Sequence, residues 1–354
     1  MKKLAIICGT LHPGGAERVI SILANKLIDK YSVEIVLYYD KPIWYNISEK
    51  VKITVIEKEC PHKNMLQRML WMRRYLKNKD AVLSFLAPFN IFTLCAMFGL
   101  KVPVIVADRN DPRFVPQNKY IRKLRDIMYS FADGVVVQNE NNNKYFSKFI
   151  QKKSRVIFNP VDAEEYKGIA LETEKENKIV CVGRIIKQKN NIMMLKAFAN
   201  ICEEFKDYKL VFYGDGDMRE ELEKQAETLQ IADRVVFAGN VKNVIEHIKD
   251  AQMYVMTSNY EGMPNTLLEA MCAGLPVIST RVSGAVDVIE NGKNGALVDV
   301  NDVAALTEEI RHFITDKEHA TRCAKNASML ADYLKKEKII AQWSEYIETF
   351  MKRK

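Results

Sequence analysis

The sequence predicts an α/β protein of two doubly wound domains, each with a parallel sheet that helices cover on both faces. Three observations lead to this prediction. Short apolar runs rich in valine and isoleucine recur, stretches with helical period separate most of them, and the series stops at Pro160 and restarts after a polar stretch. Apolar strands that alternate with helices are typical of a buried parallel sheet. A chain of 354 residues also suits two domains better than one.

The first domain is expected to cover residues 1–160. Its strands are predicted at 4–8, 33–38, 82–85, 104–107 and 134–137, with helices at 16–27, 65–76 and 121–131. Residues 81–100 carry no charge over the length that a bilayer needs. Because Pro88 and Asn90 interrupt that stretch, we predict a strand at 81–85, a turn and a buried helix at 91–98 in place of a membrane span.

The second domain is expected at residues 161–332 and begins with a polar, acidic stretch at 162–177. Its strands are predicted at 179–182, 210–213, 235–237, 253–256, 276–279 and 296–298. Residues 333–354 are predicted to form a terminal helix that packs back on the first domain. This helix has an apolar stripe that needs another surface to cover it, made by Trp343, Tyr346, Ile347 and Phe350.

Composition and charge narrow the class of protein. Hydrophobic residues at 48% and charged residues at 28% exclude disordered and fibrous chains. The seven cysteines are scattered without a Cys-x-x-Cys pair, which predicts a reducing cytoplasm rather than disulfides or zinc. The net charge of +8 divides into +14 before residue 161 and −6 after it. This asymmetry predicts an anionic partner for the first domain, either a nucleic acid or a membrane surface.

The turn after the first predicted strand holds Gly14 and Gly15 directly before a helix. It lacks the Gly-x-Gly-x-x-Gly spacing of a dinucleotide fingerprint. Paired glycines let a ligand approach the positive end of the helix closely. A tight turn without a ligand explains the same pair equally well.

The second domain has more specific features. Gly183, Arg184 and Lys189 follow the strand at 179–182, where ligands of open α/β sheets bind, and the two cations suit phosphate oxygens. After the strand at 253–256, Pro264 suits the start of a helix whose first amides, at 265–267, can hold an anion. The alternative for the cations is a solvated basic loop.

Two carboxylates flank this anion site, Glu261 before the helix and Glu269 eight residues later. Carboxylates beside a phosphate suggest a ligand with hydroxyl groups on both sides of its phosphates, such as a nucleotide sugar. Stabilisation of the helix dipole explains Glu261 but leaves Glu269 in an apolar helix unexplained.

These motifs resemble glycosyltransferase family 4. The resemblance rests on GRIIKQKN, YGDGDMREEL, FAGNV, SNYEGMPNTLLEAMCAGLPVIST and NGKNGALV, and on CGTLHPGGAERV near the start, which is similar to enzymes that build bacterial surface glycans. It implies a GT-B fold, in which two Rossmann-like domains are followed by a helix that crosses back. It also implies a retaining transferase for hexoses or N-acetylhexosamines, with a nucleotide-diphosphate donor, by default a UDP-sugar.

The resemblance also assigns roles to residues. Arg184 and Lys189 match the diphosphate-binding pair, and Glu261 and Glu269 match the E-x7-E motif that contacts the donor sugar and the ribose. Glu261, Arg184 and Lys189 are the expected catalytic residues. The remaining donor contacts are expected from Gly14, Gly15, Gly183, Gly214, Val241, Gly262, Met263, Pro264, Asn265, Thr266 and Leu267.

Three further residues are candidates for the acceptor side: His12 in the glycine turn, and Asp108 and Arg109 after the strand at 104–107. Many relatives have a histidine or an acid at the latter place, and an Asp-Arg pair there is as often a structural salt bridge. No Asp-x-Asp triplet ends a strand, so we expect neither a metal nor another cofactor. The charge of the leaving diphosphate would then be stabilised by Arg184, Lys189 and the helix amides.

The acceptors of the family are often lipid-linked, which favours a membrane over a nucleic acid as the anionic partner. Two basic and apolar clusters fit helices that lie on the inner face of the plasma membrane, and solvated basic faces are the alternative. The first holds Lys63, Arg68, Met69, Trp71, Met72, Arg73, Arg74, Tyr75, Lys77 and Lys79; the second holds Lys119, Tyr120, Ile121, Arg122, Lys123, Leu124 and Arg125.

Two other functions compete with a cytoplasmic, peripheral glycosyltransferase. A nucleotide-sugar epimerase or a glycogen-type synthase has the same fold, but the GGAER turn favours a glycosyltransferase. A non-enzymatic nucleic-acid-binding protein would explain the basic first domain. It lacks a recognisable binding motif, however, and leaves Glu261 and Glu269 without a role.

Overall fold

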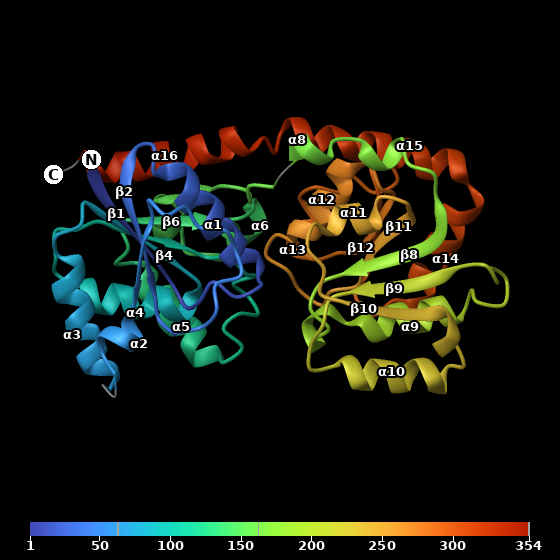
Figure 1. Ribbon diagram of the computed structural model, residues 1–354, viewed down its shortest axis with the longest axis horizontal. Helices are drawn as coiled ribbons and strands as arrows, with labels where there is room; N and C mark the ends of the chain where they lie inside the picture. Colours follow the sequence, from blue (N-terminus) through green and yellow to red (C-terminus); the bar gives the residue numbers. More distant parts are fainter. Residues whose placement is uncertain (62–63, 162, 353–354) are drawn as a thin grey trace. The chain divides into compact units, whose positions relative to one another are not determined.

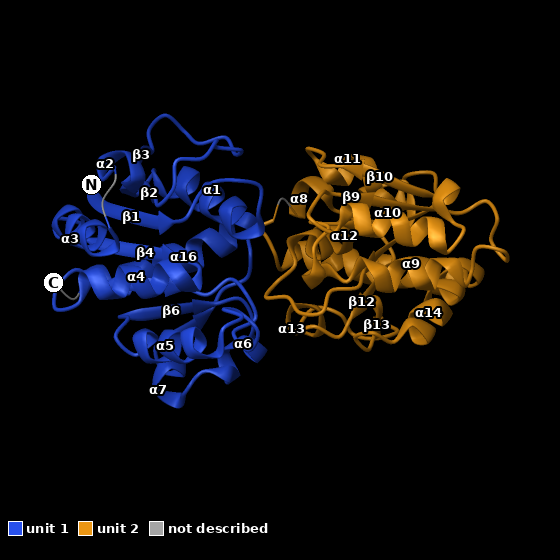
Figure 2. Cartoon of the chain, turned by 90° about the horizontal axis from the view of Figure 1, so that it is seen from below, with its two compact units in different colours: residues 1–160, 336–354 blue, residues 161–335 orange. Residues whose placement is uncertain are grey.

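The computed structural model describes residues 1–61, 64–161 and 163–352, and its strands and helices alternate along the chain (Figure 1). The chain forms two compact units, coloured separately in Figure 2. Unit 1 comprises Met1–Pro160 together with Lys336–Lys354, and unit 2 comprises Val161–Lys335. Each unit has its own parallel sheet, so the prediction of two doubly wound α/β domains is confirmed.

Unit 1 contains a seven-stranded sheet in the order β3-β2-β1-β4-β5-β6-β7. Its strands are β1 (Lys2–Cys8), β2 (Tyr31–Leu37), β3 (Lys52–Val55), β4 (Ala81–Phe85), β5 (Val104–Ala107), β6 (Gly134–Val137) and β7 (Ser154–Val156). Strand β1 pairs with both β2 and β4, so the order of the strands reverses there. Ligands of open α/β sheets bind at the carboxyl ends of the strands around such a point.

Helices cover both faces of this sheet. They are α1 (Gly15–Leu27), α2 (Ile56–Glu59), α3 (Met65–Leu76), α4 (Ala87–Met97), α5 (Lys119–Tyr129), α6 (Glu140–Tyr145), α7 (Lys148–Gln151) and α16 (Lys336–Met351). Successive residues of β1 point to opposite faces, as strand geometry requires. Leu4 and Ile6 join the core under α1 and α16, whereas Ala5 and Ile7 join the core under α3 and α4.

The terminal helix α16 completes one face of unit 1. Its apolar stripe is buried, and Trp343 is fully buried with its ring 5.8 Å from that of Phe85 in β4. The hydroxyl of Tyr346 accepts a hydrogen bond of 3.0 Å from the amide of Val135 in β6. The chain therefore returns to unit 1 after unit 2, and the surface that the stripe needs is the unit 1 sheet.

The stretch at 81–100 differs from the prediction in one respect. Helix α4 begins at Ala87 and includes both Pro88 and Asn90, so the predicted turn at these residues is wrong. Proline lacks an amide hydrogen and fits the first turn of a helix, where that hydrogen has no helical partner. Asn90 is buried and donates to the carbonyl oxygen of Ala107 and the hydroxyl of Tyr129. None of the helices described is long and apolar enough to cross a membrane.

Strand β3 was missed by the sequence analysis, and it helps to hold α3 on the sheet. Glu34 in β2 is buried and accepts hydrogen bonds from Thr54 in β3, from Tyr75 in α3 and from Lys79, three residues after α3. Burial by itself would raise the pKa of Glu34, but these hydrogen bonds together lower it to about 2. The carboxylate is therefore charged at neutral pH and fixes the end of α3 against the sheet.

Unit 2 has a six-stranded sheet in the order β10-β9-β8-β11-β12-β13. The strands are β8 (Glu176–Val182), β9 (Lys209–Tyr213), β10 (Val235–Gly239), β11 (Ala251–Met256), β12 (Val277–Thr280) and β13 (Ala296–Val298). The helices are α8 (Ala163–Tyr166), α9 (Asn191–Ala199), α10 (Arg219–Thr228), α11 (Val244–Ile248), α12 (Asn265–Ala273), α13 (Ser283–Val286), α14 (Val303–Thr315) and α15 (Lys317–Ser328). The polar, acidic stretch at 162–177 contains α8 and the start of β8; residue 162 lies outside the described residues.

Candidate active site

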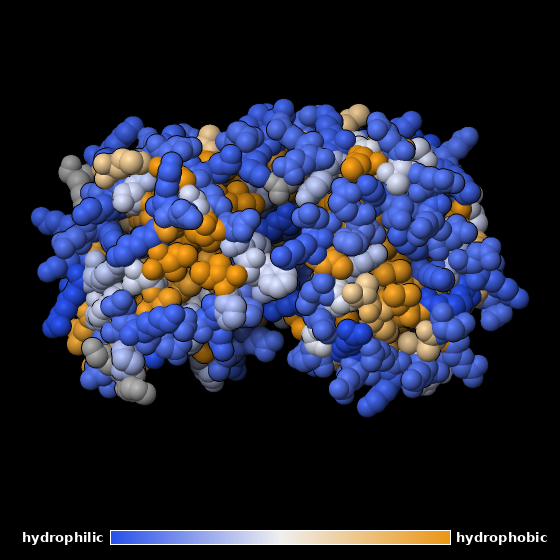
Figure 3. Space-filling view, viewed as in Figure 1, coloured by the Kyte–Doolittle hydropathy of each residue, from blue (hydrophilic) through white to orange (hydrophobic). Residues whose placement is uncertain are grey.

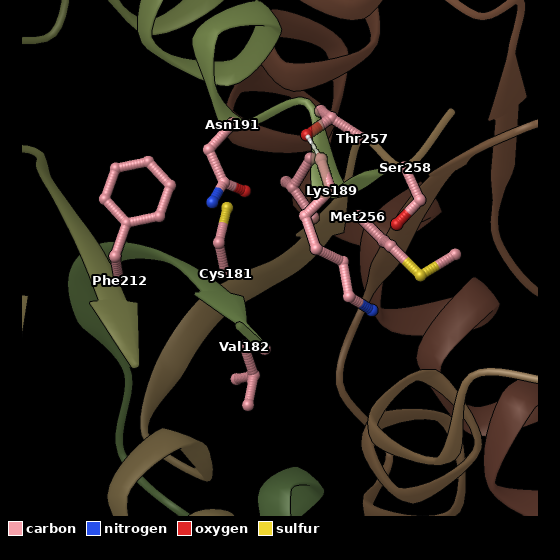
Figure 4. Close-up of a pocket in the computed structure, with 10 residues that line it drawn as sticks. Cys181, Val182, Lys189, Asn191, Phe212, Met256, Thr257 and Ser258 are labelled. Atoms are coloured by element: carbon pink, nitrogen blue, oxygen red, sulfur yellow. Dashed lines mark hydrogen bonds between the residues drawn. The ribbon is translucent and has the colours of Figure 1, made fainter. Parts of the chain in front are cut away.

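The candidate site of unit 2 lies where β8 and β11 end. These strands are parallel neighbours, so the loops that follow them, at 183–190 and 257–264, share one edge of the sheet. Strand β8 also pairs with β9 on its other side, which makes it the point where the strand order reverses. A pocket at this edge is lined by residues of both loops, and Lys189 is among the side chains around it (Figure 4).

Hydrogen bonds between the two loops hold them in register. The amide of Asn259 donates to the carbonyl oxygen of Gln188 at 2.8 Å, and its side chain donates to that of Lys187 at 2.9 Å. In the other direction, the side-chain amide of Gln188 donates to the carbonyl oxygen of Tyr260 at 2.9 Å. The short 3₁₀ turn at 187–189 is thus fixed against the loop that carries the first predicted carboxylate.

Lys189 and Glu261 form an ion pair at the centre of this arrangement. The ammonium Nζ of Lys189 lies 2.7 Å from Oε1 of Glu261, and their side chains are only 17% and 10% exposed. The hydroxyl of Ser258 donates to the same carboxylate oxygen at 2.8 Å, and the hydroxyl of Thr280 donates to the carbonyl oxygen of Ser258 at 2.7 Å. An ammonium has three donors, so Lys189 can keep this bond and still bind a phosphate oxygen.

Arg184 lies in the same loop as Lys189, but its side chain has a different environment. Its side chain is exposed and makes no hydrogen bond or ion pair within the described part of the chain. The structure therefore brings Lys189 to Glu261 but leaves Arg184 at the surface. An exposed guanidinium keeps its fork of donors for an external oxyanion.

Helix α12 starts directly after Pro264, close to the predicted position. Its first intrahelical hydrogen bond runs from the amide of Leu268 to the carbonyl oxygen of Pro264. The amides of Asn265, Thr266 and Leu267 therefore come before the helical ladder, in the position that binds anions in other helices. The hydroxyl of Thr266 lies 2.9 Å from that of Tyr254 and so anchors the helix to β11.

The second predicted carboxylate, Glu269, lies inside α12 and is only 1% exposed. The loop before the helix is also buried at Gly262, Met263 and Pro264. A Cβ at Gly284 in α13 would lie 2.4 Å from the carbonyl oxygen of Gly262, so α13 presses directly on that loop. The predicted donor-binding loop is thus rigidly packed on its inner side.

Two glycines bring neighbouring loops of this edge together. Gly183 and Gly214 have φ of +143° and +138°, and a Cβ at Gly214 would lie 2.0 Å from the carbonyl oxygen of Gly183. The amide of Gly214 also donates to the carbonyl oxygen of Gly239 at 2.7 Å. Val241 follows soon after, half-buried beyond β10. The absence of a side chain at Gly214 is therefore a packing requirement.

In unit 1, Gly14 caps α1 and Gly15 is the first residue of that helix. The hydroxyl of Tyr45 accepts from the amide of Gly14 at 2.9 Å and donates to its carbonyl oxygen at 2.8 Å. The glycine turn is thus held by a residue that the sequence analysis missed, because no local pattern connects residues 31 positions apart. His12 is exposed in the same turn.

Asp108 and Arg109 do not form a salt bridge with each other, so that alternative for the pair is wrong. Asp108 is buried and accepts from the hydroxyl of Tyr129 at 3.1 Å, and its ion-pair partner is Arg125 in α5 at 3.8 Å. Burial raises the pKa of Asp108, and the charge of Arg125 opposes that rise. Asp108 therefore belongs to the internal framework of unit 1, and Arg109 is buried beside it.

No group of three or more His, Cys, Asp or Glu side chains is placed to hold a metal ion in the ranges 1–61, 64–161 and 163–352. Metal-independent transfer stays a prediction.

Solved structures with the same fold define the class of protein. Anabaena Alr3699/HepE in complex with UDP and glucose has a TM-score of 0.86 at 19% identity, covering 99% of this chain and 100% of that one. Sucrose-phosphate synthase from Thermosynechococcus elongatus has a TM-score of 0.86 at 17% identity, covering 100% of each chain. The fold is that of GT-B glycosyltransferases, as the resemblance implied.

Sequence comparison identifies the family. The model described as glycosyl transferases group 1 matches residues 162–329. A Campylobacter jejuni relative, named as the alpha-1,4-N-acetyl-D-galactosaminyltransferase of GalNAc-alpha-(1->4)-GalNAc-alpha-(1->3)-diNAcBac-PP-undecaprenol, is 30% identical over 357 residues and covers 98% of both chains. A second one, named as an N-acetylgalactosamine-N,N'-diacetylbacillosaminyl-diphospho-undecaprenol 4-alpha-N-acetylgalactosaminyltransferase, is 27% identical over 368 residues. The chain belongs to the group 1 glycosyl transferases, and its predicted glycosyltransferase activity is confirmed.

Proposed function

We propose that this protein transfers an N-acetylhexosamine from a UDP-sugar to a glycan carried on a lipid diphosphate, with retention and without a metal. The observation that carries the proposal is the Lys189–Glu261 pair at the ends of β8 and β11, next to the start of α12. Lysine and the first amides of a helix suit a diphosphate, and a carboxylate beside them suits sugar hydroxyls.

The proposed chemistry uses these groups in order. Cleavage of the bond between sugar and phosphate puts negative charge on the leaving diphosphate, which Lys189, Arg184 and the α12 amides would stabilise as it develops. Glu261 would orient the donor sugar, and Glu269 would accept hydrogen bonds from the ribose. The cation and the carboxylate are already fixed against each other, so little reorganisation is needed when the donor binds.

The relatives support the choice of acceptor. Both Campylobacter jejuni enzymes are named for acceptors on undecaprenyl diphosphate and for transfer of N-acetylgalactosamine. The Anabaena neighbour was solved with UDP and glucose, which is in keeping with a uridine donor. We extend both features to this chain as a proposal.

The donor can be tested by thermal-shift measurements with a panel of nucleotide sugars. A donor at a hundred times its dissociation constant is expected to stabilise the fold by about 2.7 kcal/mol, because it binds only the folded state. UDP-N-acetylgalactosamine and UDP-N-acetylglucosamine should produce the largest shifts, and GDP-mannose serves as the control. Equal shifts for all donors, or none, would count against the proposal.

The reaction is tested with an undecaprenyl-diphosphate-linked oligosaccharide and the preferred donor, with and without EDTA. A lengthened lipid-linked glycan with a new α-linkage is expected, unchanged by EDTA. A product in which the sugar is epimerised and not transferred would identify the epimerase alternative instead.

We further propose that unit 1 binds the inner face of an anionic membrane through the outer surfaces of α3 and α5. Hydrophobic residues reach the surface of unit 1 (Figure 3). Helix α5 supports the proposal most strongly, since it buries only Arg125 and Tyr129. Its exposed apolar side chains are Tyr120, Ile121, Leu124 and Ile127, and Phe131, two residues after the helix, is exposed as well. Lys119 and Lys123 are exposed on the same helix, as a helix that lies on an anionic bilayer requires.

The structure corrects part of the predicted basic surface. Arg125 is fully buried, where its guanidinium holds the carbonyl oxygens of Pro112 and Val115, so it is not available to a membrane. Met72 of α3 is also buried, whereas Met65 and Leu66 are exposed. Lys63 lies outside the described residues.

Membrane binding can be measured by sedimentation with phosphatidylglycerol vesicles at low salt. The double substitution Leu124→Glu/Ile127→Glu is expected to abolish sedimentation, because it places two charges on the apolar face of α5. Val236→Glu changes a residue of unit 2 that is 42% exposed, similar to 46% for Leu124, and should have no effect. Two results would contradict the proposed surface. One is equal sedimentation of the wild type and both variants, and the other is sedimentation of the wild type with neutral vesicles as strong as with anionic ones.

A further inference from the structure

Arg109 is a buried cation to which the described residues offer no hydrogen-bond acceptor. It follows β5 at the carboxyl edge of the unit 1 sheet, and the residue is only 6% exposed. None of its three guanidinium nitrogens makes a hydrogen bond within the described part of the chain. Burial of a cation without hydrogen bonds is unfavourable, and here it lowers the pKa of Arg109 to about 9, against the opposing charge of Asp108.

A second buried donor lies beside it. The guanidinium carbon of Arg109 is 5.8 Å from the ring of Trp343, and the indole nitrogen of Trp343 also lacks a hydrogen-bond partner among the described residues. Arginine and tryptophan side chains can only donate hydrogen bonds. The two side chains therefore form a donor cluster without a hydrogen-bond acceptor among the described residues, in which the guanidinium lies over the Trp343 ring as a cation–π contact.

Asp108 does not supply the missing acceptor. Its carboxylate already accepts from the amide of Asn110 and from Tyr129, and its ion pair is with Arg125. Asp108 acts on Arg109 only through its charge. The donor cluster is thus formed by the loop after β5 and by α16, which are far apart in the sequence and belong to the same unit.

We propose that Arg109 and Trp343 form a binding site for a phosphoryl oxyanion in unit 1. This deepens the proposed function, because a diphosphate occurs in both of its substrates, the nucleotide sugar and the lipid-linked acceptor. A phosphoryl group offers several acceptor oxygens and a negative charge, which are the two things that this cluster lacks. Arg109 would act as a binding and positioning residue.

The first experiment tests the site without requiring activity. In a Lys189→Ala/Arg184→Ala background, which disables the proposed diphosphate site of unit 2, inorganic pyrophosphate is titrated by calorimetry. Arg109→Met is expected to weaken binding at least about tenfold, the size of a charge-assisted hydrogen bond. Arg113→Gln removes a partly exposed charge from the same loop and should leave binding unchanged. Equal affinity with and without Arg109 would overturn the proposal.

The melting temperature of the ligand-free protein provides an independent readout. If Arg109 serves a ligand, Arg109→Met removes an uncompensated buried charge and should raise the melting temperature by a few degrees. If Arg109 only supports the fold, the same change should lower it, and that result would overturn the proposal. Should Arg109→Met fail to fold, Trp343→Phe keeps a ring against Phe85 and removes the indole N–H. Wild-type pyrophosphate affinity in that variant would likewise overturn it.

Kinetics then identify the source of the phosphoryl group. When Arg109→Met is the only substitution in the enzyme, a raised KM for the lipid-linked acceptor with an unchanged Kd for UDP assigns the site to the acceptor. A raised Kd for UDP assigns it to the donor. If no transfer occurs with any acceptor, the proposed function fails, and the pyrophosphate titration still decides whether this site exists.

Discussion

Replacement of Lys189 with alanine is expected to lower kcat about a thousandfold and to leave a folded protein. Loss of one preorganised donor to a developing negative charge costs a factor of about 10² to 10³. The alanine variant also leaves Glu261 without its cation, although the hydroxyl of Ser258 still donates to the same carboxylate. Single-turnover measurements with saturating donor report the chemical step directly, and circular dichroism confirms the fold.

Two companion variants make this result specific. Lys187→Ala removes an exposed positive charge from the same 3₁₀ turn and is expected to keep nearly full activity. Glu261→Gln keeps a side chain that can accept a hydrogen bond from Ser258 but removes the charge that holds Lys189, so an intermediate loss is expected. A folded Lys189→Ala variant with normal turnover would refute the donor-site assignment.

Gly214→Ala is expected to destabilise unit 2 by about 3 kcal/mol, the sum of backbone strain and overpacking. The new Cβ would lie 2.0 Å from the carbonyl oxygen of Gly183, a backbone atom that cannot rotate away. Separation of these loops would also move Arg184, which follows Gly183 directly. Scanning calorimetry should show the unit 2 transition lowered by about 6–12 °C.

Gly239→Ala is the matched control for this experiment. Gly239 also has a positive φ, of +72°, but a Cβ there would have nothing within 4 Å. Only the backbone strain remains, about 1 kcal/mol. If the two variants melt at the same temperature, contact between the Gly183 and Gly214 loops is not what requires glycine at position 214.

The hydrophobic pattern of the sequence predicted several strands in full, but it did not predict β3 and β7. The apolar runs at 104–107, 134–137 and 296–298 match the observed strands in full, because buried parallel strands are apolar on both faces. Strand β3 has the sequence Lys-Ile-Thr-Val, and β7 is only three residues long. Both strands alternate or begin with polar residues and lack the continuous apolar run of β13, an edge strand that is equally short, so their own sequences carry little signal.

The site could be predicted in outline but not in its contacts. Arg184, Lys189 and Glu261 were recognisable because each follows an apolar run, which puts all of them at the carboxyl edge of a parallel sheet. The ion pair between Lys189 and Glu261 joins residues 72 positions apart, and it depends on β8 and β11 being neighbours. Two intervening strands lie elsewhere in the sheet, and no local pattern reveals that crossover.

The partners of Asp108 also could not be predicted from the sequence. Sequence placed Arg109 beside it, but adjacent residues after a strand point in different directions. The carboxylate instead meets Arg125 and Tyr129, which lie one turn apart on the inner face of α5. A basic residue counted toward the outer face of α5 thus proves to be internal, and the neighbouring arginine is left with its donors unused.

The position of α16 has a consequence for how the protein is made. A ribosome delivers residues 1–160 first, with all seven strands of one sheet, but α16, which completes one face of that sheet, emerges only after residues 161–335. The nascent chain therefore carries an uncovered apolar face, to which Trp343 and Ile347 have yet to be added, throughout synthesis of residues 161–335. Unit 2 can complete its fold before unit 1 does, the reverse of their order in translation.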